Sequence, residues 1–434
     1  MHNFGSLYKT ELKKILSKRA IWITLVIGMA LLIIAEISNI LPFGIGGRYD
    51  FPDGTSMSAF EFYRQQKKTS EEITGQKLDD ALLQRMRTEM KEFLKDKQDL
   101  PYAETTGAKG IKIEIEGNFE DAGIYKEYRG IWFAAEKLGY EDMLSKLYTQ
   151  FQDAEDPNRL LMESDAAEYY QAVADNLNHV FLRDGLSEEE TAYWSEKYDR
   201  QSIPFAYGYA HGYSGFIQMF YVYIWFVFLL IAFSLAGVFS EEVSHRTDAM
   251  ILSTRNGRRP VSLAKLCAGI TLGILEMAVV LGVNLAVCLI TFGHGGWDTP
   301  LLMVIQSTAW DLTVGQGVLL FIGLAFVLAM VFAAVTMLLS QILGSSTGVL
   351  AVQIGILLLG IFNIPDSLGI ISQFWAIRPT NFLMYYAFSE YRLFNIGSHF
   401  LNVFQAAGIL YPLLIAAAVP ITYVSYQRMQ VKSR

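Results

Sequence analysis

Six stretches of this chain are almost entirely apolar, and each is long enough to cross a lipid bilayer as a single helix. An α-helix rises about 1.5 Å per residue, so about 20 residues cover the roughly 30 Å of hydrocarbon in a membrane. Charged residues make up only 18% of the chain, whereas soluble domains contain about a quarter. The sequence therefore predicts an α-helical integral membrane protein with six transmembrane helices. These are residues 20–41, 216–240, 262–292, 313–340, 345–363 and 409–427.

The charges outside these stretches predict the side of the membrane that each segment faces. Residues 1–19 carry five basic residues and one acidic residue, a net charge of +4. Residues 241–265 carry five and three, a net of +2, and the tail, residues 428–434, carries +3. Residues 42–216 hold 20 basic and 33 acidic residues, a net of −13. Cytoplasmic flanks are enriched in Lys and Arg. We therefore expect a multi-pass protein of the cell membrane with both termini in the cytoplasm and residues 42–215 outside.

The segment 42–215 has the patterns of a mostly helical extracellular domain between spans one and two. In residues 78–96 the apolar side chains recur at helical spacing. They are Leu78, Leu82, Leu83, Met86, Met90, Phe93 and Leu94. Similar patterns occur around 124–150, 160–182 and 187–199, and residues 111–119 alternate like a strand. The acidity of the domain favours either a cationic ligand or a plain solvated surface.

Two further segments are neither spans nor ordinary loops. Residues 1–19 form an amphipathic pattern in which apolar side chains oppose lysines, as in a helix that lies in the membrane interface. This cytoplasmic helix either anchors the first span or contacts a cytoplasmic partner. Residues 364–408 mix aromatic residues with scattered charges, a composition typical of the headgroup level. We expect an extracellular interfacial or re-entrant segment there, either a lid over a pathway between subunits or simple packing.

The polar stretch FSEEVSHRTDAMILSTRNGRRP (239–260) separates spans two and three. Its Glu241 and Glu242 are of the residue type favoured at a helix N-terminus. An apolar cluster then lies within a charged setting, which is the pattern of a short helix that docks into a groove of another protein. Asn-Gly and the following proline predict a turn into the next helix. The segment 241–261 is thus expected to be a docking helix and turn, with Ala249, Met250, Ile251 and Leu252 as its apolar contact.

The wider stretch AGVFSEEVSHRTDAMILSTRNGRRPVSLAKLCAG (236–269) resembles the intracellular segment of ABC transporter permeases of the ABC-2 type. That family has a glutamate pair after span two, then an arginine and threonine, an apolar run, a Ser-Thr pair and a basic turn. A lysine follows one turn into span three. The present sequence lacks the glycine that commonly lies between the arginine and the threonine. The matching positions are Glu241, Glu242, Arg246, Thr247, Ile251, Leu252, Ser253, Thr254, Arg258 and Lys265.

The resemblance implies a mechanical subunit whose energy comes from a partner. The chain contains no GxxxxGK[ST] phosphate loop, so ATP and Mg²⁺ are expected on a separate ABC ATPase subunit, with no cofactor in this chain. Six spans are half of the usual set, which implies a second permease subunit, identical or homologous. The expected ATPase-coupling residues are Glu241, Glu242, Arg246, Ala249, Met250, Ile251 and Leu252. We identify no catalytic or metal-binding pattern.

Two acidic residues lie inside predicted spans. Glu276 is near the middle of span three, where an unpaired charge costs about 2.5 to 3.5 kcal/mol. It either lines a substrate pathway or subunit interface, or makes an interhelical hydrogen bond, with Asn284 and Gln353 as candidates. Glu36 lies near the outer end of span one and is expected to reach the interface.

Three classes of function compete for this sequence. The leading one is the permease of an ABC exporter, or of a machine that clears the membrane of an amphiphilic substrate such as an antimicrobial peptide or a lipid. The second is a receptor whose extracellular domain binds a ligand and whose cytoplasmic segment recruits a partner. The third, a membrane-embedded enzyme, has no paired carboxylates, HExxH or Ser/His pattern to support it. Membrane lipids are expected contacts, and no nucleic acid is.

Overall fold

The computed structural model describes residues 2–40, 47–97, 119–245, 247–253, 258–362, 364, 369–383, 385–396 and 399–428. The chain divides into two compact units. Unit 1 contains Met1–Ile33, Ile217–Ala286 and Leu319–Arg434, and unit 2 contains Ile34–Phe216 and Val287–Val318. Helices dominate both units, which confirms the predicted fold class at this level.

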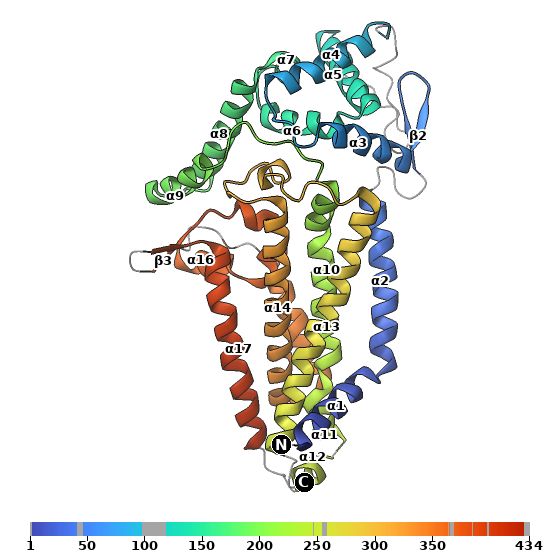
Figure 1. Cartoon of the computed structure of the whole chain (residues 1–434). Helices are drawn as coiled ribbons and strands as arrows, with labels where there is room; N and C mark the ends of the chain where they lie inside the picture. The colour runs from blue at the N-terminus through green and yellow to red at the C-terminus, as the bar shows by residue number, and fades with distance from the viewer. Residues whose placement is uncertain are drawn as a thin grey trace. The chain divides into compact units, whose positions relative to one another are not determined.

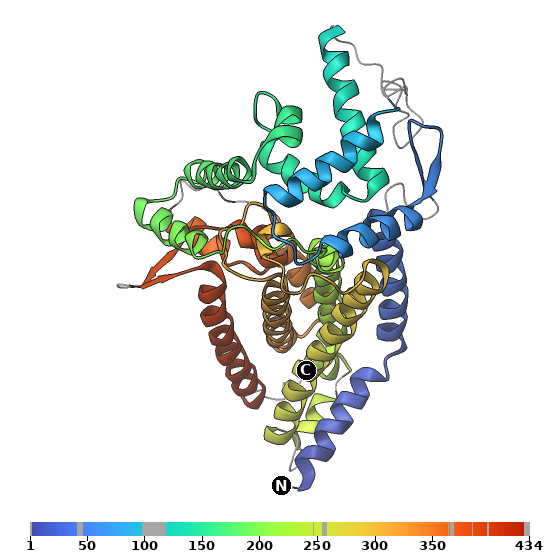
Figure 2. The same cartoon turned by 45° about the horizontal axis from the view of Figure 1, so that its top comes forward.

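Among the described residues, five helices are long and apolar enough to cross a membrane (Figure 1). They are α2 (Arg19–Ile40), α10 (His211–Leu235) with its continuation α11 (Gly237–Ser244), α13 (Arg259–Phe292), α14 (Val314–Leu343) and α17 (Val403–Gln427). The amphipathic N-terminal segment forms α1 (His2–Leu16), and Figures 1 and 2 show its axis turned away from that of α2.

Aromatic stacking and one close approach hold the long helices of unit 1 together. Phe220 stacks on Phe321 with ring centroids 4.9 Å apart, and Phe228 stacks on Phe332 at 4.3 Å, so α10 packs along α14. At Gly273 of α13, an added Cβ would lie 3.2 Å from the Cβ of Ala333. The glycine therefore lets α13 approach α14 closely, as small residues do in membrane helix pairs.

A shorter helix occupies the position of the predicted fifth span. Helix α15 (Ser346–Leu359) has 14 residues, about 21 Å in length, which is less than the thickness of a bilayer core. Arg378 Nε and Thr380 Oγ1 donate to the carbonyl oxygen of Gly360 at 2.8 and 2.6 Å, directly beyond the end of this helix. Side chains from a later segment thus satisfy the backbone where α15 stops. A sixth full crossing stays a prediction.

The segment that follows α15 is built from short, irregular elements. It contains α16 (Ile370–Ala376), the 3₁₀ helices η3 (Pro379–Leu383) and η4 (Tyr385–Ser389), and an antiparallel hairpin of β3 (Phe394–Ile396) and β4 (His399–Leu401). The hairpin was not predicted, and α17 begins at Val403 rather than at residue 409. Asn402 forms a capping box with Gln405 there, which fixes the earlier start. The side of the membrane on which this segment lies stays a prediction.

Unit 2 contains most of the large polar segment, which is helical as expected. Figure 2 shows its helices with α4 beside α5. Leu78, Leu82, Leu83, Met86 and Met90 are buried, which confirms most of the predicted apolar stripe, while Phe93 and Leu94 are half-buried. Residues 111–118 of the predicted strand lie outside the described residues, and Phe119 begins a helix. The elements are β1 (Arg48–Asp50), β2 (Ser56–Ser58), α3 (Ala59–Ile73), α4 (Asp80–Leu94), α5 (Phe119–Leu138), α6 (Glu141–Phe151), α7 (Pro157–Glu163), α8 (Ala166–Arg183), α9 (Glu188–Asp199) and η1 (Leu301–Met303).

Glu36 corrects one expectation about the first span. Its side chain is buried in unit 2, and Cys288 Sγ lies 2.8 Å from Glu36 Oε1, so the thiol donates to the carboxyl group. The carboxyl group is therefore enclosed by the protein rather than exposed at its surface. A neighbouring donor on α13 satisfies it instead, which is how acidic side chains inside membrane helices are usually held.

Candidate functional site

The segment between α10 and α13 forms two helices rather than the single docking helix predicted within 241–261. Helix α11 ends at Ser244 and α12 (Asp248–Ser253) begins three residues after His245. The N–H groups of His245 and Thr247 donate to the carbonyl oxygens of Glu241 and Glu242 at 2.8 and 2.9 Å, which closes α11. The two glutamates consequently lie in the last turn of α11. They do not cap a helix N-terminus, so basic side chains must compensate their charge.

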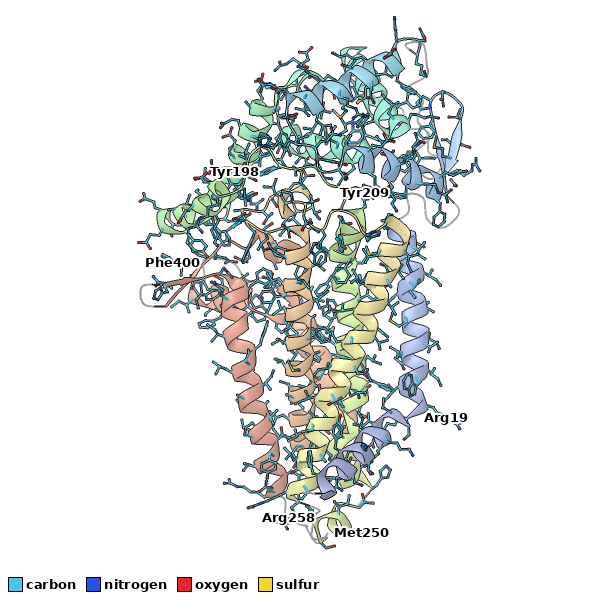
Figure 3. All side chains as sticks on the ribbon, in the orientation of Figure 1. Arg19, Tyr198, Tyr209, Met250, Arg258 and Phe400 are labelled. Carbon is cyan, nitrogen blue, oxygen red and sulfur yellow. The ribbon has the colours of Figure 1, made fainter. Side chains whose placement is uncertain are left out.

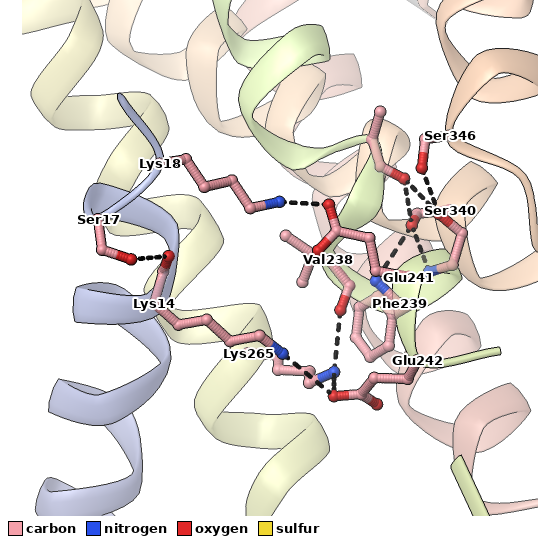
Figure 4. Close-up of polar contacts among 12 residues, drawn as sticks. Lys14, Ser17, Lys18, Val238, Phe239, Glu241, Glu242, Lys265, Ser340 and Ser346 are labelled. Atoms are coloured by element: carbon pink, nitrogen blue, oxygen red, sulfur yellow. Dashed lines mark hydrogen bonds and ion pairs between the residues drawn. The ribbon is translucent and has the colours of Figure 1, made fainter. Parts of the chain in front are cut away.

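Glu242, in the last turn of α11, is the centre of a buried ion-pair cluster (Figure 4). Its carboxylate pairs with Lys265 of α13, and Lys14 Nζ of α1 lies 3.5 Å away. Tyr426 of α17 donates from its hydroxyl over 3.5 Å. Both Glu242 and Lys265 are buried, at 4% and 0% exposure. One carboxylate therefore joins α1, α11, α13 and α17. We call Lys14, Lys18, Glu241, Glu242, Lys265 and Tyr426 the α11 cluster.

Lys265 is fully enclosed by partners that suit a cation. Besides its ion pair with Glu242, its Nζ donates to the carbonyl oxygen of Val238 at 2.9 Å. The same atom lies 5.1 Å from the ring centroid of Phe239 and 5.9 Å from that of Tyr426. Aromatic faces at such distances attract cations. The lysine of the family motif is thus the group that ties α11 to α13.

The second pair of the cluster is more exposed. Lys18 pairs with Glu241, and each side chain keeps about a third of its surface open to solvent. Exposed pairs contribute little because solvent and salt screen them, whereas breaking a buried pair leaves an uncompensated charge. The Glu242–Lys265 pair is therefore the stronger link. The Lys18–Glu241 pair helps to orient the chain just after α1.

The apolar residues of α12 point in different directions. Met250 is 72% exposed and lies at the extreme end of unit 1 (Figure 3). Leu252 is only 7% exposed and packs inside. Ile251 is half-buried. Arg246 and Thr254 lie outside the described residues, as does the side chain of Ala249. Among the predicted apolar contact residues whose side chains the structure describes, Met250 is the most exposed.

A model of the family described as ABC-2 family transporter protein matches residues 6–431, nearly the whole chain. This chain belongs to the ABC-2 family. It is accordingly a multi-pass membrane permease subunit of an ABC transporter, a family whose members work with a separate ABC ATPase subunit. Searches of curated proteins and of solved structures gave no match.

Glu276 of this permease is buried within the single chain. Its Oε1 accepts a hydrogen bond from Ser234 Oγ of α10 at 2.6 Å. Gln353, one of the partners considered from the sequence, donates instead to Thr336 Oγ1 at 2.6 Å. The position of Glu276 between α13 and α10 favours the interhelical hydrogen bond over an open pathway.

Several residues of the permease site did not stand out in the sequence. Lys14 and Lys18 belong to the lysine-rich segment 1–19, which was expected either to anchor the first span or to contact a cytoplasmic partner, and Tyr426 is one aromatic residue in an apolar span. Ser340, described below, is a single hydroxyl in α14. One signal was available for the pair of Glu242 and Lys265: a lysine just inside a span, with a glutamate pair at the end of the previous span, predicts a buried ion pair.

Proposed function

We propose that this permease carries an amphiphilic substrate, an antimicrobial peptide or a lipid, driven by ATP hydrolysis on a separate ABC ATPase. The ATPase subunit would hold ATP and Mg²⁺, and a second permease subunit, identical or homologous, would complete the pathway. In this arrangement α11 and α12 face the cytoplasm, and the segment 42–215 lies outside the cell. The −13 charge of residues 42–216, against +4 and +2 on the basic segments, supports that orientation.

The exposure of Met250 carries the proposal that α12 contacts the ATPase. A large apolar side chain that is 72% exposed, on a short helix among charged residues, favours burial against a partner. Leu252 is already buried in the permease, so it supports α12 from within. The ion pairs of Glu241 and Glu242 would then pass a movement of α12 to α1 and α13.

Met250→Asp tests this contact. Burying a methionine side chain contributes about 1.5 to 3 kcal/mol, so the substitution should weaken binding of the co-expressed ABC ATPase at least about tenfold. Permease stability should not change, because Met250 makes few contacts within the chain. Ser253→Asp is the matched control, since it adds the same charge to an exposed position of the same helix. Full ATPase copurification with Met250→Asp would refute α12 as the docking element.

A further inference from the structure

The helix that links the membrane part of α10 to the ion-pair cluster has its regular hydrogen bonding interrupted at Ala236. Helix α10 ends at Leu235 and α11 begins at Gly237. In an uninterrupted α-helix, the N–H group of Ser240 would donate to the carbonyl oxygen of Ala236. Here Ser340 Oγ of α14 occupies that position. The Ser340 hydroxyl donates to the carbonyl oxygen of Ala236 at 2.7 Å and accepts from the N–H group of Ser240 at 3.1 Å.

The hydroxyl of Ser340 is fully used by this break. It also accepts from the N–H group of Phe239 at 3.1 Å, so its one donor and both of its acceptor sites are engaged (Figure 4). Ser340 is completely buried. A side chain inserted into the backbone ladder is one of the few established causes of a helix kink. The side chain that opens this helix therefore comes from a different helix.

Further contacts hold the short helix beyond the break. Ser240 Oγ donates to Ala236 O at 2.9 Å and lies 3.1 Å from Ser346 Oγ. Lys265 holds the carbonyl oxygen of Val238 and the carboxylate of Glu242. The eight residues of α11 thus form a lever, attached to α14 at its start and to α13 along its length. This lever leads directly to α12.

We propose that Ser340 is a positioning residue: its hydroxyl sets the angle at which α11 leaves α10 and so couples movement of α12 to the membrane helices. This inference rests on the proposed contact between α12 and the ATPase. Without the hydroxyl, the N–H group of Ser240 and the carbonyl oxygen of Ala236 have only each other as backbone partners. The ladder hydrogen bond from Ser240 to Ala236 then forms, and the direction in which α11 leaves α10 changes.

The geometric test uses spin labels on either side of the break. Cysteines at Leu229 and Val243, both about 40% exposed, are labelled after Cys267 and Cys288 have been replaced. The 14-residue spacing corresponds to about 21 Å in a straight helix. Ser340→Ala should shift the distance distribution toward that value. Ser346→Ala, which removes a neighbouring hydroxyl outside the ladder, should leave it as in the wild type. An unchanged distribution in Ser340→Ala would overturn the proposal.

The functional test separates the hydroxyl from packing. Ser340→Thr and Ser340→Val have the same shape, and only threonine keeps the hydroxyl. With the co-expressed ATPase bound, Ser340→Val should lower the permease-dependent ATP hydrolysis at least about fivefold, whereas Ser340→Thr should retain it. Equal behaviour of the two variants, or a shifted distance with unchanged hydrolysis, would refute the coupling role. If the wild-type permease does not bind the ATPase, the proposed function is refuted. The spin-label distances still show whether Ser340 sets the angle at which α11 leaves α10.

Discussion

The buried pair of Glu242 and Lys265 predicts two single substitutions with unequal costs. Lys265→Met leaves Glu242 with Lys14 at 3.5 Å and the Tyr426 hydroxyl at 3.5 Å. Glu242→Gln leaves the fully buried ammonium of Lys265 with a carbonyl oxygen and two aromatic rings. Removing one partner of a buried ion pair costs about 3 to 5 kcal/mol. We expect Glu242→Gln to reach that range and Lys265→Met to cost about 2 kcal/mol, because Lys14 still compensates the remaining carboxylate.

The double variant gives the sharper result. With both charges replaced by neutral groups of similar volume, no buried charge remains, and such replacements are often close to neutral. We expect Glu242→Gln with Lys265→Met to be more stable than Glu242→Gln alone, which requires a coupling free energy in a double-mutant cycle larger than the cost of about 2 kcal/mol of Lys265→Met. The assay is denaturant unfolding of the purified, detergent-solubilised permease. Lys18→Met, in the exposed pair, is the control and should cost less than about 1 kcal/mol. Additive single effects would refute the buried pair as the link between α11 and α13.

Three further predictions concern other parts of the permease. Burial raises the pKa of Glu136 to about 7, so its neutral form is favoured in the folded state. Its stabilising contribution, at most about 3 kcal/mol, is complete below about pH 4.5 and is lost as the pH rises through about 7. Hydrogen exchange in α3 and α5, corrected for intrinsic rates, should therefore be faster at pH 8 than at pH 5.5. Glu136→Gln should remove this difference. Cysteines placed at Lys95 and Arg258 should differ in labelling by an impermeant thiol reagent on whole cells, with Lys95 labelled and Arg258 protected until the cells are permeabilised; the reverse pattern would invert the topology. Glu276→Gln should retain the Ser234 contact, normal expression and permease-dependent ATP hydrolysis, whereas a loss of hydrolysis at unchanged stability would favour the pathway role.

The membrane class and most helices of this permease were predictable because they depend on local composition. An apolar run of about 20 residues can satisfy its backbone in a bilayer only as a helix, so five long helices lie where the runs predict them. The fifth run, residues 345–363, forms a helix that is shorter than the run, for a physical reason. Hydropathy does not record that Arg378 and Thr380 will bind the carbonyl of Gly360 and end the helix.

The arrangement of the candidate site depends on contacts between distant residues, which composition does not encode. Glu241 and Glu242 were recognised as important, but their partners Lys18 and Lys265 lie just after α1 and on α13, more than twenty residues away in each direction. The four apolar residues of 249–252 looked equivalent in sequence. The fold makes Leu252 an interior residue and leaves Met250 at the surface, because only one face of a six-residue helix can pack inward.

The contacts that hold the α11 lever to its neighbours determine how it can move. Ser340 of α14 binds at Ala236, just before α11, and Lys265 of α13 binds at Val238 and Glu242. Lys18, between α1 and α2, binds at Glu241. Each contact satisfies either a charge or a backbone group that would be costly to leave buried without a partner. A force on α12 that pulled α11 alone would break all of them together. Under the proposed coupling, the lower-energy response would be for α13, α14 and α1 to move with α11, a coordinated tilt that a passive loop between two spans would not produce.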